Sequence, residues 1–229
     1  MCRLRSRSAN QHLRFQIRID ALHGTSAAAN ESPRADLRPQ TMILEGIVTT
    51  LNADSSANIS PMGPLVDAAM ERLVLRPYQT ATTYVNLKRT GEGVFHVTDD
   101  VLLLARTALG EPEPLPALVH AEKVNGVILA DACRWYAFRV KSIDDSQPRS
   151  QIVADVVDRG RIRDFFGFNR AKHAVVEAAI LATRVGLLPR EDIAVEFNRL
   201  AVIVEKTGGE QERTAFEYLK DYVDRTSHV

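Results

Sequence analysis

Residues Met42–Asn86 read MILEGIVTTLNADSSANISPMGPLVDAAMERLVLRPYQTATTYVN, and the first part of this stretch has the alternation of a β-hairpin. Successive residues from Ile43 to Leu51 point to opposite faces of an extended strand. The polar run at 52–56 predicts a turn, and a return strand follows over 58–60. The sequence PMGP at 61–64 predicts a kink, because two prolines remove backbone donors and glycine permits unusual dihedrals. A kink of this kind leaves backbone amides free for a ligand.

The composition is that of an ordinary globular protein and argues against two classes of partner. Of 229 residues, 45% are hydrophobic, and 29 lysines and arginines balance 29 aspartates and glutamates. This balance gives no global charge that would attract nucleic acid or an anionic membrane. No apolar run approaches the length of a membrane span. The two cysteines, Cys2 and Cys133, have neither disulfide-framework nor zinc spacing, so we expect a reduced, cytoplasmic compartment.

Residues 1–41 differ in composition from the rest of the chain. They contain seven arginines and three acidic residues, a net charge of roughly +4, which leaves roughly −4 on the remainder. An arginine-rich, serine-rich leader can be a targeting peptide, but this one lacks the apolar core of a secretory signal. We favour a disordered tail or an extension translated upstream of Met42, because β structure is predicted to begin abruptly at Met42.

The rest of the chain predicts short strands first and helices last. Strands are expected at 70–76, 80–87, 94–98, 133–143 and 151–157, and Asp99 or Asp100 caps one helix over 101–110. Short strands at this spacing favour an antiparallel barrel over a βαβ array. From about Phe168 the apolar residues recur at helical spacing, which predicts three helices. We therefore predict an α+β fold, with a barrel over 42–160 and a helical region over 161–229 packed on it.

Arg76 and three nearby threonines are candidate ligands for a phosphate monoester. Pro77 fixes Arg76 at a strand end, and Thr80, Thr82 and Thr83 follow shortly after. A phosphate needs a bidentate cation and several neutral donors that converge on its oxygens. The alternative is that the threonines are ordinary strand residues and Arg76 is a solvated edge charge. The chain has no Rossmann glycine fingerprint and no P-loop motif, so any nucleotide must bind in another way.

A flat aromatic cofactor needs backbone donors beside a thin, partly apolar edge, and the segment from Ser60 to Gly63 offers both. Taken alone, such a segment is more often a strand end followed by a turn. Tyr84 and Asn86 are expected on the same side of their strand as Thr82, so that all three line one cleft. The commoner role for Tyr84 is that of a core residue.

Three segments together resemble an uncharacterised family within the FMN-binding split-barrel, flavin-reductase-like superfamily. They are LEGIVTTLNADSSANISPMG at 44–63, LRPYQTATTYVNL at 75–87 and FFGFNRAKHAVVEAAI at 165–180. The resemblance extends from Met42 to the last helix and implies a homodimer of six-stranded split barrels that binds FMN near the subunit interface. It implies contact with the isoalloxazine by Asn58, Ser60, Met62 and Gly63, and contact with the phosphate or ribityl chain by Arg76, Thr80, Thr82 and Thr83. Tyr84 and Asn86 are further candidates.

A polar stripe marks the first of the three C-terminal helices. At about 100° per residue, Arg170, His173, Glu177 and Arg184 fall within about 60° of one another. The functional interpretation is a stripe that faces the flavin cleft or a partner subunit, with His173 and Glu177 as candidate acid–base residues. The alternative is a solvated or interface salt-bridge face. The remaining histidines show no metal-ligand spacing, so no metal site is expected.

These expectations lead to an FMN-dependent oxidoreductase of the flavin-reductase type, which passes electrons from NAD(P)H to an unknown small acceptor. The flavin would carry the difficult chemistry, which fits a sequence without a recognisable catalytic triad or paired-carboxylate motif. The alternative is a non-catalytic flavin-binding or protein-interaction module whose helices recruit a partner.

Overall fold

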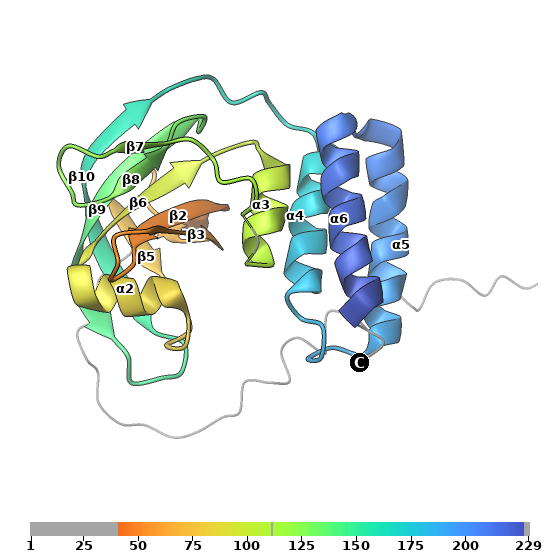
Figure 1. The fold of residues 1–229 in the computed structure, drawn as a ribbon, viewed down its shortest axis with the longest axis horizontal. Helices are drawn as coiled ribbons and strands as arrows, with labels where there is room; N and C mark the ends of the chain where they lie inside the picture. Colours follow the sequence, from red (N-terminus) through yellow and green to blue (C-terminus); the bar gives the residue numbers. More distant parts are fainter. Residues whose placement is uncertain (1–40, 111, 227–229) are drawn as a thin grey trace, which may run out of the picture. The chain divides into compact units, whose positions relative to one another are not determined.

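Eight antiparallel strands form one sheet that curls into an open half-barrel (Figure 1). The computed structural model describes residues 41–110 and 112–226. The strand order is β1-β4-β5-β10-β9-β6-β2-β3. The bounds are β1 (Met42–Ile43), β2 (Gly46–Leu51), β3 (Ala57–Met62), β4 (Leu65–Val66), β5 (Arg72–Leu75), β6 (Glu92–Val97), β9 (Arg134–Asp144) and β10 (Gln151–Arg161), and a separate hairpin pairs β7 (Leu118–His120) with β8 (Val127–Leu129). The predicted antiparallel split barrel is confirmed.

The predicted hairpin is formed by β2 and β3, with Thr49 opposite Ile59. Its return strand is longer than predicted, because it continues through Pro61 to Met62 and the chain turns only at Gly63. β3 is the last strand of the sheet. Proline is tolerated there because one side of an edge strand needs no ladder hydrogen bonds.

Residues 80–87, predicted as a strand, instead lead into a helix, α2 (Thr82–Thr90). Its buried residues include Thr83, Tyr84 and Leu87, which have the spacing of one helix face. Packing of that face overrides the strand preference of the threonines. Gly91 ends the helix at φ +70°, and its N–H donates to the carbonyl of Leu87 at 2.9 Å. The prediction of a strand here was wrong.

Four further helices share a second apolar core, distinct from the core of the barrel. They are α3 (Val101–Ala108), α4 (Arg170–Ala182), α5 (Arg190–Thr207) and α6 (Glu210–Thr226). Asp100 is the residue that caps α3, since its carboxylate accepts hydrogen bonds from the N–H groups of Leu102 and Leu103. α3 contacts β3 as well as α4 and α6, and so connects the sheet to the C-terminal helices (Figure 1).

Charged side chains attach the C-terminal helices to the end of β6. Lys172 of α4 forms a mostly buried ion pair with Glu212 of α6 at 2.8 Å, and it donates to the backbone carbonyl of Asp99 at 2.7 Å. Asp99 in turn accepts a 2.6 Å hydrogen bond from Arg163. Burial alone would raise the pKa of Asp99, but hydrogen bonds from Arg163 and from the N–H of Phe166 outweigh burial and lower the pKa. These contacts fix the path of the chain from β10 into α4.

A buried histidine links the barrel to the β7–β8 hairpin. The ring of His96 lies between β2 and β8, with Nδ1 3.1 Å from the carbonyl oxygen of Ile47 and Nε2 accepting the N–H of Leu129 at 3.1 Å. Because Nε2 accepts, the proton of the neutral ring is on Nδ1, which donates to Ile47. Complete burial lowers the pKa of His96 to about 4. Protonation of this ring would break the bond to Leu129.

His96 should make the stability of the fold depend on pH between about 6.5 and 4. The unfolded chain binds the proton more tightly than the folded chain, so the contribution of His96 is complete above pH 6.5 and is lost as the pH falls toward 4. In His96→Gln, which retains a donor and an acceptor but does not titrate, the loss of unfolding free energy from pH 7 to pH 4.5 should be smaller than in wild type by about 2 kcal/mol. Urea unfolding of both proteins at the two pH values measures this difference. Equal losses would contradict the assignment.

Candidate functional site

Three of the predicted cofactor residues meet in one hydrogen-bond network between the β2–β3 hairpin and α2. The amide nitrogen of Asn58 donates to the hydroxyls of Thr50 and Thr83, each at 3.1 Å. The amide nitrogen of Asn86 donates to Thr50 at 3.1 Å and to Asn52 at 2.9 Å. Thr83 and Asn86 are buried. The network therefore holds α2 against the hairpin.

Thr50 and Asn52 were missed by the sequence analysis. Thr50 lies directly opposite Asn58 in the β2–β3 register. The sequence predicted the turn at 52–56 but gave no register for the hairpin, so this cross-strand pair was not identified. What the sequence did not show was that a helix would supply the remaining partners.

The N-terminus of α2 carries unneutralised backbone N–H groups. The N-cap residue is Ala81, no side chain caps the helix, and its first turn contains no acidic residue. Each of the other described helices has a capping side chain, as α3 and α4 do, or acidic residues in the first turn, as α5 and α6 do. The exposed residues Thr80 and Thr82 flank this end of α2. Such a helix end attracts an anion.

Arg76 lies at the other end of the turn that leads into α2. Within residues 41–110 and 112–226, its Nε is the one buried side-chain nitrogen or oxygen without a hydrogen-bond partner. Side chains from residues 149 and 150 hold the turn in place. The backbone carbonyl of Arg76 accepts from Arg149 at 3.0 Å, and that of Pro77 accepts from the hydroxyl of Ser150 at 2.8 Å. A buried guanidinium nitrogen without a partner is costly, so this geometry calls for an acceptor that the protein does not supply.

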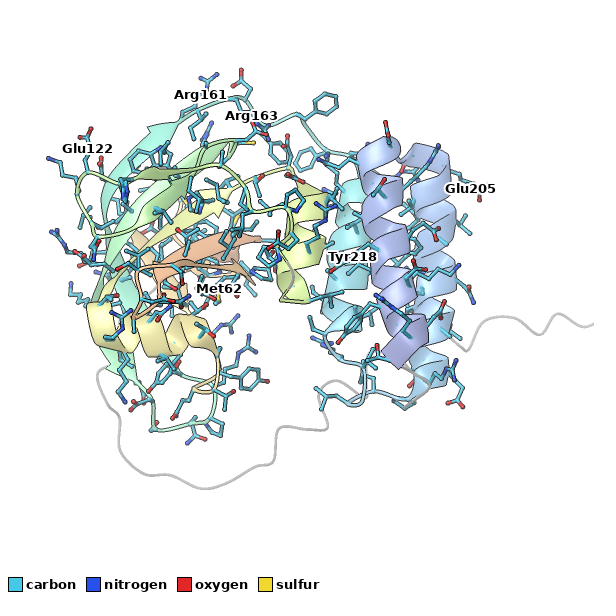
Figure 2. The ribbon with its side chains drawn as sticks, viewed as in Figure 1. Met62, Glu122, Arg161, Arg163, Glu205 and Tyr218 are labelled. Atoms are coloured by element: carbon cyan, nitrogen blue, oxygen red, sulfur yellow. The ribbon has the colours of Figure 1, made fainter. Side chains whose placement is uncertain are left out.

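The segment that follows β3 is closely covered by the β1–β2 connection. A Cβ atom on Gly63 would lie 2.7 Å from Oε1 of Glu45 and 2.8 Å from a methyl group of Ile43, so any larger residue would displace these two side chains. The N–H of Leu44 donates to the carbonyl of Pro64 at 3.1 Å. Ser60, Met62 and Gly63 are half-buried, and Figure 2 shows Met62 at the end of β3.

The polar stripe of α4 acts electrostatically on the segment around Gly63, through Glu177 of the stripe and Glu45, which lies beside Gly63. Partial burial, with the negative charge of Glu177 as a second cause, raises the pKa of Glu45. Glu177 is therefore near enough to Glu45 for the two charges to repel. His173, one turn earlier on α4, is exposed, and its ring centroid lies 6.1 Å from that of Phe168. Glu45 was not identified from the sequence, because 132 positions separate it from Glu177.

The stripe is shorter than predicted. α4 ends at Ala182, so Arg184 lies beyond the helix and does not continue the row of Arg170, His173 and Glu177. Arg170, His173 and Glu177 are exposed, as a solvated face would be, and no ion pair joins His173 to Glu177 in the part of the chain that the structure describes.

Tyr84 lies apart from the network of Asn58 and Thr83. Its hydroxyl donates to Asp145 at 2.7 Å and accepts from Lys88 at 3.0 Å, while its ring belongs to the barrel core. The expectation that Thr82, Tyr84 and Asn86 share one side was wrong, because residues two positions apart on a helix point about 200° apart. The core role considered for Tyr84 is the one observed.

The described ranges lack two kinds of feature. No group of three or more histidine, cysteine, aspartate or glutamate side chains among these residues is arranged to hold a metal ion. No helix among the same residues combines the length and apolar character needed to cross a membrane.

The curled sheet, the edge segment at Gly63 and the uncapped helix beside Arg76 define a split-barrel protein with an anion-attracting site. The chain belongs to the family described as "Protein of unknown function (DUF447)". The model of its N-terminal domain matches residues 44–163, and a second model of the family matches residues 169–221. The resemblance found in the sequence is confirmed.

Comparison with solved structures finds similar chains at low sequence identity. An FMN-bound DUF447 protein from Methanosarcina mazei is 23% identical, with 80% of this chain and 96% of that chain covered and a TM-score of 0.67. The styrene monooxygenase flavin reductase from Pseudomonas putida S12 is 11% identical over 53% of this chain and 82% of that chain, with a TM-score of 0.44. An FMN-binding protein from Thermus thermophilus is 12% identical over 61% and 81%, also with a TM-score of 0.44. No curated protein is detectably similar in sequence. The first likeness establishes the fold, and the other two are too distant to add to it.

Removing the Thr83 hydroxyl should loosen α2 from the hairpin. Thr83→Val keeps the shape of the side chain but deprives Asn58 of one acceptor, so the free energy of unfolding should fall by about 1 kcal/mol. Thr83→Ser, which retains the hydroxyl, should lose less than half as much. Urea denaturation monitored by far-UV circular dichroism measures both variants. A Thr83→Val protein as stable as wild type would show that this bond does not hold α2.

Proposed function

We propose that this chain is an FMN-dependent oxidoreductase that passes electrons from NAD(P)H to a small acceptor. The observation that carries the proposal is the unpartnered, buried Nε of Arg76, one short turn before a helix N-terminus that has neither a cap nor an acid. A cation and several backbone N–H groups that lack acceptors suit a dianionic phosphate monoester. The Methanosarcina mazei relative, which has the same fold, is an FMN-bound protein, and this supports FMN as the source of that phosphate.

The hydrogen bonds of the described residues divide the candidate cofactor residues into two groups. Thr80 and Thr82 are exposed at the helix end, and Thr83 accepts from Asn58 and keeps its own hydroxyl proton for a phosphate oxygen. In contrast, Asn86 uses its amide nitrogen within the network, and Tyr84 is held by Asp145 and Lys88. We assign contact with the phosphate to Arg76 and the threonines, and a positioning role to Tyr84 and Asn86.

The half-buried end of β3 is suited to the flat part of the cofactor. Ser60 and Gly63 offer backbone groups beside the thioether of Met62, and Asn58 retains its side-chain carbonyl as an acceptor. Because Glu45 already fills the space next to Gly63, a ring would have to lie along the backbone on the open side. When FMN is bound, it supplies hydride transfer at its N5 atom.

The acid–base group of this proposal lies on α4. His173 is exposed, and Glu177 interacts with Glu45, which lies against Gly63. We propose that His173 supplies a proton to the reduced acceptor and that Glu177 positions the acceptor. The non-catalytic alternative, a flavin-binding module, predicts tight FMN retention without steady oxidation of NAD(P)H.

Arg76→Ala should discriminate between phosphate binding and other modes of flavin binding. Loss of a charged hydrogen bond of about 2 kcal/mol should raise the Kd for FMN about 30-fold, while the Kd for riboflavin, which lacks the phosphate, stays within about threefold of wild type. Quenching of flavin fluorescence measures both constants. Arg199→Ala, which removes an exposed arginine on α5, is the matched control and should change neither. Equal weakening of FMN and riboflavin, or no weakening at all, would sink the assignment of Arg76.

Turnover of NAD(P)H by wild type and by His173→Gln should distinguish the enzyme proposal from the non-catalytic flavin-binding alternative. On the FMN-loaded protein, kcat for NAD(P)H oxidation should fall on the order of 100-fold, as for loss of a general acid, with the FMN Kd unchanged. Arg170→Gln, an exposed change one turn earlier on α4, should leave kcat near wild type. An FMN-loaded wild-type protein that oxidises neither NADH nor NADPH with any acceptor tested would favour the module. A His173→Gln protein with wild-type kcat would remove His173 from the chemistry.

A further inference from the structure

Tyr78 and Arg149 form an exposed aromatic–cation pair beside the turn that carries Arg76. The guanidinium carbon of Arg149 lies 5.7 Å from the centre of the Tyr78 ring, within the range of a cation–π contact. Tyr78 is 59% exposed, and Arg149 is exposed as well. Because both side chains lie on the surface, core packing does not account for them. We call them the Tyr78–Arg149 pair.

Hydrogen bonds hold the backbone of this pair in place. Tyr78 and Arg149 face each other in an antiparallel bridge, and a backbone hydrogen bond of 3.0 Å flanks the bridge on each side. The side-chain amide of Gln79 donates to the backbone carbonyls of residues 145 and 147 at 2.7 and 2.8 Å, which ties the turn between β9 and β10 to the one that leads into α2. An exposed pair held in this way is pre-organised, so a ligand that contacts it loses little ordering entropy.

The pair lies on the same side of its strand as Arg76. β5 pairs Leu75 with Ile152 of β10, and the bridge between Tyr78 and Arg149 keeps that register. Side chains two positions apart in an extended strand point to one face, about 7 Å apart, so Tyr78 follows Arg76 on that face. Nε of Arg149 also donates to the backbone carbonyl of Arg76 at 3.0 Å. A phosphate bound at Nε of Arg76 would therefore have the Tyr78–Arg149 pair next to it.

The chemistry of the pair suits a second phosphate and a flat base. Within the described part of the chain, Arg149 uses its Nε, and its two Nη atoms have neither a hydrogen bond nor an ion pair. A guanidinium binds phosphate oxygens through donors of this kind. The exposed ring of Tyr78 suits a base, because every base has a π face that stacks on an aromatic ring. A second phosphate and a base, next to the phosphate of FMN, are the parts that distinguish FAD from FMN.

We propose that the Tyr78–Arg149 pair is a subsite for the adenylate half of FAD, so that the chain binds FAD as well as FMN. Tyr78 stacks on the adenine, and Arg149 binds the second phosphate of the pyrophosphate. This inference rests on the proposed function, because it takes the first phosphate to be held by Arg76. NAD(P)H contains the same adenosine diphosphate moiety, but only in FAD is that moiety joined to the flavin phosphate.

Isothermal titration of the full chain with FMN and with FAD tests the proposal. Tyr78→Ala should raise the Kd for FAD about tenfold, as for loss of one base stack, and leave the Kd for FMN within about twofold of wild type. Tyr78→Phe keeps the ring and should retain both constants, since the Tyr78 hydroxyl has no hydrogen-bond partner among the described residues. Leu187→Ala, which changes an exposed apolar residue far along the chain, is the matched control and should alter neither constant.

The outcomes separate failure of the subsite from failure of the flavin site. A Tyr78→Ala protein that binds FAD as tightly as wild type, or that loses affinity for FMN and FAD equally, would overturn the subsite. So would a wild-type chain that binds FMN but not FAD, and both results leave the proposed FMN site standing. An unchanged Kd for FAD with a raised Kd for NADPH would assign the pair to the electron donor instead. A wild-type chain that binds neither flavin would overturn both proposals.

Discussion

The seating of α2 against the β2–β3 hairpin is the constraint on which the rest of the site depends. Asn58 donates to both Thr50 and Thr83 and so links three elements, and Asn86 donates to Thr50 from the next turn of the helix. In a water-poor setting such a network is rigid only when all its members are satisfied. By holding α2 in place, this network fixes the uncapped N-terminus of α2 next to the turn that carries Arg76. A strand at this position, as the threonines suggested, would have offered no converging N–H groups.

A second set of polar contacts determines where α4 lies. Lys172 joins Asp99 and Glu212, so β6, α4 and α6 meet at one buried junction. Asp99 also accepts the N–H of Phe166, so the same carboxylate that anchors the helices holds the chain in place where β10 leads into α4. The negative charge of Glu177 on α4 contributes to the raised pKa of Glu45, which lies beside Gly63. One junction thus fixes both the position of α4 and the backbone at Phe166.

The sequence predicted the features that depend on local periodicity and missed those that depend on distant partners. Alternation revealed β2 and β3, and helical spacing of apolar residues from about Phe168 revealed the three C-terminal helices. α2 was missed because a run of threonines suits a strand, while the helix is decided by burial of Tyr84 and Leu87. Glu45 could not be recognised, because its significance comes from Glu177 and from the space beside Gly63. Arg76 and Thr83 were predicted as phosphate ligands from residue type alone, and the sequence did not show the uncapped helix end beside them.

The most direct test of the central claim is a crystal structure of the chain after saturation with FMN. The phosphate should lie within hydrogen-bond distance of Nε of Arg76 and of the backbone N–H groups in the first turn of α2, with the isoalloxazine along Met62 and Gly63. A phosphate bound elsewhere, with Arg76 Nε still unpartnered, would contradict it. So would a protein that takes up no FMN, since the buried guanidinium and the uncapped helix would then need another explanation.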